Sequence, residues 1–275
     1  MSEARPGTSR GRTWFEALTG AVGVGSPRSI LCCDAPLGDE QARFLAVVPD
    51  AHNRFPRARA GEVGVEEAWG LAQRVREVIE SDAHGTRRPL VAIVDVVSQA
   101  YGRLEELLGI HLAGAAAADA YTSARIAGHP VLALLVGRAV SGAFLAHGAQ
   151  ANRILALSDP GVVVHAMGKA AAARVTRRSV AEIESLGEVV PPMSYDIRVY
   201  ADLGLLDGLI TGVDADAPST ADVARVAAQL ASAVEQVRAE PHGGAARVHT
   251  LRRRPAGSAT LEVRQRMLAQ WMSAP

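Results

Sequence analysis

Residues 137–144, Gly-Arg-Ala-Val-Ser-Gly-Ala-Phe, have the composition of a turn that leads from a buried strand into a helix of small residues. One interpretation makes Ser141 a nucleophile at a strand-turn-helix corner, a relaxed nucleophile elbow that would need His and Asp partners. A second uses the backbone N–H groups of Gly142 and Ala143 at the start of the helix to hold an oxyanion. A third is purely structural, because small residues let a helix pack closely against a sheet. The segment alone leaves these alternatives open.

Residues 95–102 form another loop at the end of a buried strand and include Gln99, Ala100, Tyr101 and Gly102. Two loops at strand ends can present backbone amides to the same reacting group. Tyr101 either donates its hydroxyl or only packs. The pair of loops favours chemistry that stabilises negative charge on amides.

His165 and Lys169 are the candidates for polar side-chain chemistry, since both follow an apolar strand and bracket Ala-Met-Gly. Lys169 is the sole lysine of the chain, and an ammonium and a guanidinium are not interchangeable. This favours a site role for Lys169, against the alternative of an ordinary lysine at a helix start. His165 is either part of the site or a hydrogen-bonded core histidine.

Composition argues against several other classes of function. The 29 basic and 29 acidic residues cancel, so no basic field attracts nucleic acid or an anionic membrane. The apolar runs are far shorter than the roughly 20 residues that span a bilayer, and the polar start lacks a signal-peptide pattern, so we expect a cytoplasmic protein. We expect reduced thiols at the adjacent Cys32 and Cys33, and no metal site, because the histidines are scattered and have no cysteine partners.

The elements that position these residues alternate between strand and helix. The uninterrupted apolar runs at 90–96 and 131–136 are typical of a sheet covered on both faces. Further strands are predicted at 29–34, 44–48, 154–157 and 162–165, with turns at 35–39 and 137–142. Helices are predicted around 14–18 and at 66–80, 105–125 and 221–238, the last capped by Ser219 or Thr220, and 261–272 is amphipathic. The order predicts a layered α/β fold.

The loops, together with Gly148, the segment 152–154 and the Gly-Leu-Leu-Asp-Gly segment at 204–208, resemble the crotonase-like carboxyltransferase family. Within it, residues 44–238 most resemble the gamma subunits of biotin-independent malonate decarboxylases. The motifs that carry this likeness are Ser-Gln-Ala-Tyr-Gly at 98–102, Ser-Gly-Ala-Phe-Leu-Ala-His-Gly at 141–148 and Val-His-Ala-Met-Gly-Lys at 164–169.

The resemblance implies a crotonase-like (ClpP/crotonase) layered fold of repeated ββα units with peripheral helices. The domain of the carboxyltransferase type is placed at 29–240. The residue pattern outside it predicts an N-terminal segment with a short helix at 1–28, and a linker and C-terminal helix at 241–275, where the helix either docks or lies free on the surface. The implied amide donors are at Gly142, Ala143, Ala100, Tyr101 and Gly102. The implied substrate-binding residues are Ser141, Gln99, His165 and Lys169.

The resemblance also implies an activity and partners. With a homologous beta subunit, the chain would decarboxylate malonyl thioester on an acyl carrier protein to acetyl thioester. The carrier would bear a coenzyme-A-derived arm, a separate alpha subunit would exchange acetyl for malonyl on it, and this chain would bind no cofactor and no biotin. Three alternatives stay open: an alpha-type carboxyltransferase subunit of a biotin-dependent acyl-CoA carboxylase, a serine hydrolase using Ser141, and a non-catalytic scaffold.

Overall fold

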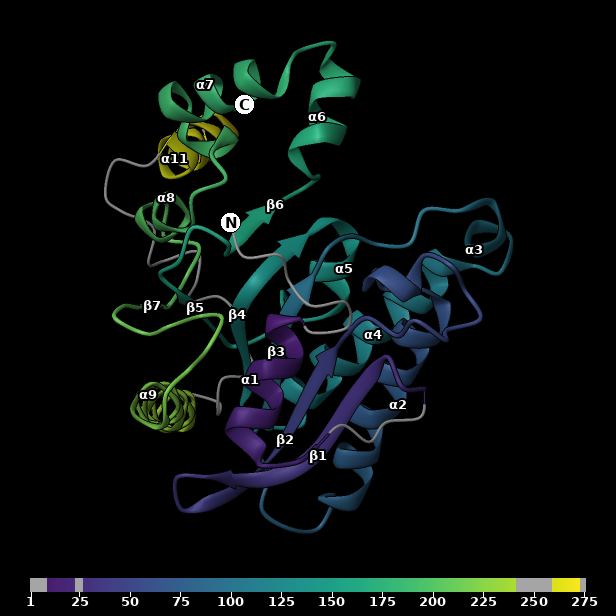
Figure 1. Cartoon of the computed structure of the whole chain (residues 1–275). Helices are drawn as coiled ribbons and strands as arrows, with labels where there is room; N and C mark the ends of the chain where they lie inside the picture. Colours follow the sequence, from purple (N-terminus) through teal and green to yellow (C-terminus); the bar gives the residue numbers. More distant parts are fainter. Residues whose placement is uncertain (1–8, 23–26, 241–258, 273–275) are drawn as a thin grey trace.

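The computed structural model describes residues 9–22, 27–240 and 259–272 and centres on a seven-stranded sheet (Figure 1). The strands lie in the order β1-β2-β3-β4-β5-β7, and β6 also pairs with β4. β1 and β2 pair antiparallel, and every other pair is parallel. The strands are β1 (Ile30–Leu37), β2 (Glu40–Val47), β3 (Leu90–Val96), β4 (Val131–Val140), β5 (Arg153–Leu157), β6 (Val163–His165) and β7 (Gly208–Ile210). This confirms the layered α/β prediction.

Helices cover both faces of the sheet (Figure 1). One face carries α2 (Val65–Ser81), α4 (Ile110–Ile126) and the short α5 (Ser141–Ala146), and the other carries α1 (Arg10–Thr19) and α9 (Thr220–Arg238). Leu71 and Val75 of α2 are fully buried, and burying such a side chain contributes about 1.5–3 kcal/mol. Ser219 caps α9 as predicted, by accepting the N–H of Asp222.

The predicted helix around Trp14 is α1, and the predicted helix 66–80 is α2. Trp14 and Phe15 of α1 pack into the same core as the sheet. The domain boundaries at 28 and 240 stay predictions. Cys32 and Cys33 are free thiols on β1.

Three predicted boundaries were wrong. β1 continues to Leu37, paired with Glu40, so the turn predicted at 35–39 is confined to Gly38 and its neighbour. β4 continues through the turn predicted from 137, because Gly137 leaves room for Asp95, whose Oδ1 would lie 2.2 Å from a Cβ there. The helix predicted at 105–125 is broken between α3 (Arg103–Leu107) and α4 at Gly109, which has a φ of 79°.

α6 (Lys169–Thr176) and α7 (Val180–Val189) lie at one end of the molecule, whereas β7 belongs to the sheet and α9 covers one of its faces (Figure 1). The sequence patterns missed β7, α6, α7, α8 (Ile197–Asp202) and the short turns η1 (Ala58–Ala60) and η2 (Pro191–Met193). The amphipathic C-terminal segment is α11 (Ala259–Met272), whose Trp271 is 84% exposed. The linker predicted at 241–257 lies outside the described residues, and docking of α11 stays a prediction.

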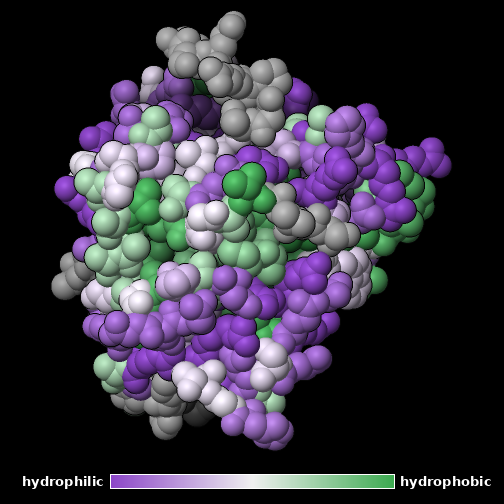
Figure 2. Space-filling view, turned by 60° about the horizontal axis from the view of Figure 1, so that its bottom comes forward, coloured by the Kyte–Doolittle hydropathy of each residue, from purple (hydrophilic) through white to green (hydrophobic). Residues whose placement is uncertain are grey.

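Large hydrophobic side chains lie exposed on the surface, and Figure 2 shows them gathered between hydrophilic regions on one face. One exposed group, which we call the leucine patch, occupies the junction of α3 and α4 that projects from the sheet (Figure 1); it consists of Leu104, Leu107, Leu108 and Leu112. Contiguous exposed apolar surface marks interaction sites in soluble proteins. No helix within the described ranges is long and apolar enough to cross a membrane.

Candidate functional site

The carboxyl ends of β3, β4 and β6 lie side by side at one edge of the sheet. Val96 of β3 pairs with Ala139 of β4, and Val140 of β4 pairs with His165 of β6. The loops that leave these strands therefore start from neighbouring positions. In open α/β sheets, this edge is where ligands bind. The register brings the three predicted motifs to one place.

Ser141 occupies the corner where β4 ends and α5 begins, with a backbone φ of 65°. A positive φ is uncommon for a residue with a side chain and costs about 1–3 kcal/mol. The Ser141 Oγ lies 2.5 Å from the Tyr101 hydroxyl, which comes from the loop after β3. Ser141 is 9% exposed and Tyr101 is 52% exposed, so the pair connects a buried corner to solvent. The two predicted loops therefore meet.

Gly142 and Ala143 follow as the next residues of α5. Their N–H groups have no acceptor one turn earlier in the helix, and the N-cap residue Val140 makes no side-chain capping bond. A Cβ at Gly142 would lie 2.1 Å from the Gln99 Oε1. Glycine is therefore what allows the Gln99 amide to lie against this backbone.

Ala100 was predicted as an amide donor to the substrate, and its N–H already has an acceptor within the protein. Its N–H donates to the Val63 carbonyl at 2.9 Å, and the Val63 N–H donates to the Ser98 carbonyl at 2.9 Å. The Ala100 amide is therefore engaged in a short parallel bridge between Val63 and the loop. Tyr101 and Gly102 are left as the candidates from this loop.

A buried carboxylate that the sequence analysis missed supports this bridge. Glu67 of α2 is fully buried and accepts hydrogen bonds from Ser29 Oγ at 2.5 Å, Asn53 Nδ2 at 2.9 Å and the Gly64 N–H at 3.0 Å. Gly64 directly follows Val63, so the carboxylate anchors the strand segment against which the loop is held. The sequence gives no sign of this role, because a buried glutamate in the first turn of a helix looks the same as an exposed one.

His147 fixes α5 from the buried side and is a structural histidine. Its Nε2 lies 3.1 Å from the Ile93 carbonyl and its Nδ1 lies 3.0 Å from the Tyr121 hydroxyl. The carbonyl can only accept, so Nε2 donates to it and Nδ1 accepts the Tyr121 O–H. Burial lowers the pKa of His147 to about 4, which keeps the ring neutral.

His165 and Lys169 meet around Tyr195, which the sequence analysis did not single out. The His165 ring stacks on the Tyr195 ring with centroids 4.1 Å apart, and its Nδ1 accepts the Met167 N–H at 3.3 Å. The Tyr195 hydroxyl donates to the Met167 carbonyl at 2.8 Å. Burial lowers the pKa of His165. The stacked pair therefore fixes the turn between β6 and α6.

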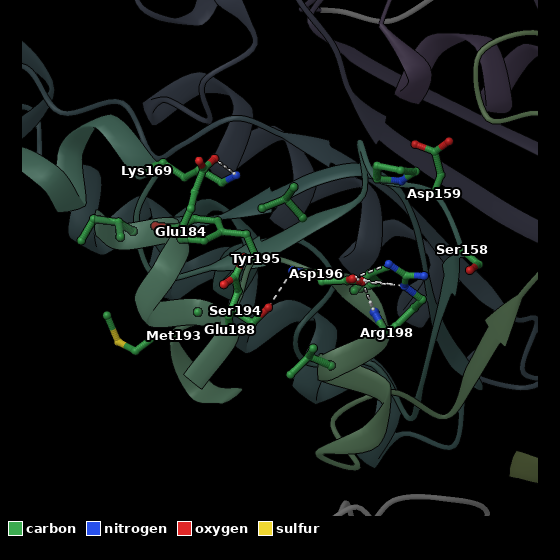
Figure 3. A pocket seen from close by; sticks show the side chains of 16 residues that line it. Ser158, Asp159, Lys169, Glu184, Glu188, Met193, Ser194, Tyr195, Asp196 and Arg198 are labelled. Atoms are coloured by element: carbon green, nitrogen blue, oxygen red, sulfur yellow. Dashed lines mark hydrogen bonds and ion pairs between the residues drawn. The ribbon is translucent and has the colours of Figure 1, made fainter. Parts of the chain in front are cut away.

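Lys169 begins α6 beside a cavity of about 610 Å³ (Figure 3). Its Nζ pairs with Glu184 Oε1 at 2.7 Å and lies 5.4 Å from the centre of the Tyr195 ring. Arg198 pairs with Asp196 elsewhere on the wall of the same cavity (Figure 3). A substrate carboxylate at Lys169 would therefore share the ammonium with Glu184.

The structure thus gathers the predicted residues into two groups linked by the pairing of β4 with β6. Gln99, Tyr101, Ser141 and Gly142 form the first, which we call the amide group. His165, Lys169 and Tyr195 form the second, which we call the histidine–lysine group. Within the described residues, no cluster of three or more His, Cys, Asp or Glu side chains is placed to hold a metal ion.

Comparison with known proteins gives one family match and one curated relative. Residues 58–271 match the family model described as the malonate decarboxylase gamma subunit. The malonyl-S-ACP:biotin-protein carboxyltransferase MADD of Malonomonas rubra is 36% identical over 185 residues, which make up 66% of this chain. The alignment spans 63% of that relative's length.

Solved structures extend the likeness to the whole fold. A Pseudomonas malonate decarboxylase hetero-tetramer in complex with coenzyme A contains a chain 53% identical to this one, with a TM-score of 0.87 and coverage of 96% of this chain and 100% of that one. The Pseudomonas MdcD-MdcE hetero-dimer gives 52% identity and a TM-score of 0.86, with the same coverage. Transcarboxylase 12S, at 21% identity and a TM-score of 0.57, matches 78% of this chain and 36% of its own and shares the fold. The predicted crotonase-like carboxyltransferase fold is confirmed.

Proposed function

The chain belongs to the malonate decarboxylase gamma-subunit family, and from this we propose that it works with a homologous beta subunit to decarboxylate malonyl thioester on an acyl carrier protein. The bond to the carboxylate breaks, carbon dioxide leaves, and the electron pair becomes an enolate of the thioester. One proton added to the enolate carbon gives the acetyl thioester. The chemical demand is stabilisation of the enolate oxygen.

The observation that carries the proposal is the approach of the two loops at the carboxyl ends of β3 and β4. It sets the backbone N–H groups of Gly142 and Ala143 beside the loop that contains Tyr101 and Gly102. Preorganised donors of this kind are worth about 3–4 kcal/mol each in the transition state. The proposed catalytic groups are therefore backbone amides, and Ser141 and Gln99 bind the substrate beside them.

The histidine–lysine group is proposed to bind the carboxylate end of the substrate. Lys169 supplies a positive charge, and the neutral ring of His165 supplies a hydrogen-bond donor at Nε2, because its Nδ1 already accepts the Met167 N–H. Moving a carboxylate from water to a drier site favours loss of carbon dioxide.

The proposed partners are the beta subunit, an acyl carrier protein whose coenzyme-A-derived arm carries the substrate, and an alpha subunit that exchanges acetyl for malonyl. The leucine patch supports a protein interface close to Tyr101. The chain itself is proposed to bind no cofactor. It is proposed to carry no biotin, because its sole lysine lies in Ala-Met-Gly-Lys and pairs with Glu184. We propose that the complex acts in the cytoplasm.

A second candidate function is transfer of the malonyl carboxyl group to a biotin-bearing protein. The Malonomonas rubra relative, whose name describes that reaction, supports it. The serine hydrolase alternative receives less support: Ser141 has the strained corner conformation of a nucleophile elbow, yet its oxygen is paired with a tyrosine hydroxyl and not with a histidine base.

The test is to purify the chain with its beta subunit and supply malonyl-acyl carrier protein, with and without a biotinylated acceptor protein. We expect acetyl-carrier product and carbon dioxide without the acceptor. Product only in its presence would favour the transfer reaction, and no product in either case would contradict both. Ser141→Ala separates the hydrolase, which would lose nearly all turnover, from an amide-based site, which should keep much of it.

A further inference from the structure

We propose that the Tyr101 hydroxyl, held by Ser141, is the acid that protonates the enolate carbon. The inference rests on the proposed function and names the proton donor that amides alone do not provide. It starts from the contact between the two loops, where the Tyr101 hydroxyl and the Ser141 Oγ are 2.5 Å apart.

The conformation of Ser141 supports a functional reason for this contact. Its φ of 65° is a strained conformation for a serine, and such outliers persist where the surroundings over-determine them and cluster at active sites. The strain points the hydroxyl of a 9% exposed serine at a tyrosine from another loop. A residue needed only for packing at this corner could be a glycine, which adopts the same φ without strain.

The position of the pair also suits the chemistry. Ser141 immediately precedes Gly142 and Ala143, whose amides are proposed to hold the enolate oxygen. The enolate carbon is two bonds from that oxygen, so a Tyr101 hydroxyl held by Ser141 lies on the side of the site where the proton is needed. Tyr101 is 52% exposed, so its oxygen can be reprotonated from solvent after each turnover. The pair is thus connected to both the reacting group and the proton supply.

The proton balance closes without any other reactant. Loss of carbon dioxide leaves the electron pair on the enolate. The Tyr101 O–H bond breaks as a new C–H bond forms at the enolate carbon, the tyrosinate accepts a hydrogen bond from the Ser141 hydroxyl, and water returns a proton to the tyrosinate. Each turnover consumes one proton from solvent.

Three other titratable groups near this edge of the sheet already have partners. His147 is fully buried, and both of its ring nitrogens are hydrogen-bonded within the core. Lys169 pairs with Glu184, and the His165 Nδ1 accepts the Met167 N–H. Among the described residues, the Tyr101 hydroxyl is the acidic group that lies in hydrogen-bond contact with Ser141, next to Gly142 and Ala143.

The experiment measures two rates on the assembled complex of the chain with its beta subunit. One is formation of acetyl-carrier protein from malonyl-carrier protein, and the other is incorporation of ¹³C-labelled carbon dioxide into the malonyl thioester that remains. An enolate that waits longer for its proton recaptures more carbon dioxide. Tyr101→Phe should therefore lower acetyl formation by about 100-fold and raise label incorporation per turnover by at least about tenfold. Ser141→Ala should change both rates in the same directions by less.

Tyr200→Phe is the matched control, because it removes a tyrosine hydroxyl from α8 and should leave both rates unchanged. Thermal unfolding and co-purification with the beta subunit establish that each variant folds and assembles. Tyr101→Phe with the parental acetyl rate would overturn the proposal, and so would a slower rate without extra label incorporation, since Tyr101 would then act before carbon dioxide leaves. An inactive parental complex would instead overturn the proposed function.

Discussion

The amide group and the histidine–lysine group are held in place by different means. The amide group sits on the main core: the bridge to Val63, the buried Glu67 and the buried His147 all support it. The histidine–lysine group sits on a small separate cluster of four buried residues, Ala172, Ala173, Ile183 and Tyr195. Its ion pair, Lys169 with Glu184, has side chains that are 40% and 51% exposed.

The difference matches two kinds of chemical demand. Backbone amides stabilise an enolate only if their geometry is fixed before the charge develops, which a sheet register and a packed core provide. A flexible ammonium attracts a carboxylate over a wider range of positions and tolerates a softer support. Substitutions in the amide group should therefore cost activity steeply, and substitutions in the histidine–lysine group should cost less.

The largest expected effect is that of Gly142→Val. The new side chain would displace the Gln99 amide, whose Oε1 lies 2.1 Å from the position of a Cβ, and would obstruct the approach of substrate to the backbone. We expect single-turnover decarboxylation by the assembled complex to fall by about 10²–10³-fold, the loss typical of one oxyanion donor. The free energy of unfolding should fall by only about 1–3 kcal/mol, which thermal unfolding checks.

Gly168→Val is the matched substitution beside the histidine–lysine group, next to Lys169. Gly168 is the N-cap of α6 with a φ of −64°, and a Cβ there meets nothing within 4 Å. Its decarboxylation rate should stay within about tenfold of the parental rate, since valine is a poor N-cap but an accommodated one. If Gly142→Val assembles, stays folded and reacts at the parental rate, the amide mechanism is wrong.

The second prediction concerns Glu67, which connects the core to the loop of the amide group. Glu67→Ala leaves Ser29, Asn53 and the Gly64 N–H without their shared acceptor. Leaving a buried donor unsatisfied costs about 1–3 kcal/mol, so we expect the free energy of unfolding to fall by about 2–4 kcal/mol in urea titrations. Glu66→Ala, at a more exposed side chain paired with Arg54, should cost less than about 1 kcal/mol. Equal losses would contradict the anchoring role.

The sequence was most informative about the amide group. Continuous apolar runs identified β3 and the first part of β4, and motifs that follow parallel strands must meet at the carboxyl edge of the sheet. It could not reveal the Tyr101–Ser141 contact, because the residues are 40 positions apart and the contact depends on the path of each loop. The sequence also could not exclude the Ala100 amide as a donor to the substrate, since its hydrogen-bond partner, Val63, lies in a segment with no strand pattern.

The segment between β6 and β7 was the least predictable. α6 and α7 are short, and the cluster they enclose buries few residues, so their apolar periodicity is weak. Tyr195 meets His165 only through tertiary packing. His165 and Lys169 were singled out by motif and by rarity, and their roles as substrate ligands stay predictions.

The third prediction compares two histidines: His147, in the main core under the amide group, and His165, on the small cluster under the histidine–lysine group. The pKa of His147 is about 4 in the folded chain, well below the 6.5 of an unperturbed histidine, so the unfolded chain binds the proton more tightly. The stabilisation is present above about pH 6.5 and is lost as the pH falls toward 4, by up to roughly 3 kcal/mol. Urea unfolding between pH 7 and 4.5 should therefore show a shallower pH dependence in His147→Gln than in the parental chain.

His165→Gln is the comparison for this measurement. The pKa of His165 is also lowered, so it too loses stability as the pH falls, but the ring is only partly buried and its contribution should be smaller. A larger change of slope in His165→Gln than in His147→Gln would reverse the contrast between the two supports.

The smallest expected effect on stability is that of Lys169→Met. The Lys169–Glu184 pair is exposed enough for solvent to screen it, so the free energy of unfolding should change by less than about 1 kcal/mol. If the ammonium attracts the malonyl carboxylate, the KM for malonyl-carrier protein should rise by about tenfold without a fall in kcat, since the negative charge leaves the carboxylate as the bond to it breaks. Arg198→Met removes the other ion-paired cation of the same cavity and should leave KM unchanged. Lys169→Arg should restore part of the affinity, because the charge is kept while the shape differs. A parental KM in Lys169→Met would assign the lysine to its surface pair with Glu184, and an equal rise in KM in Arg198→Met would show that the cavity attracts the carrier through its charge as a whole.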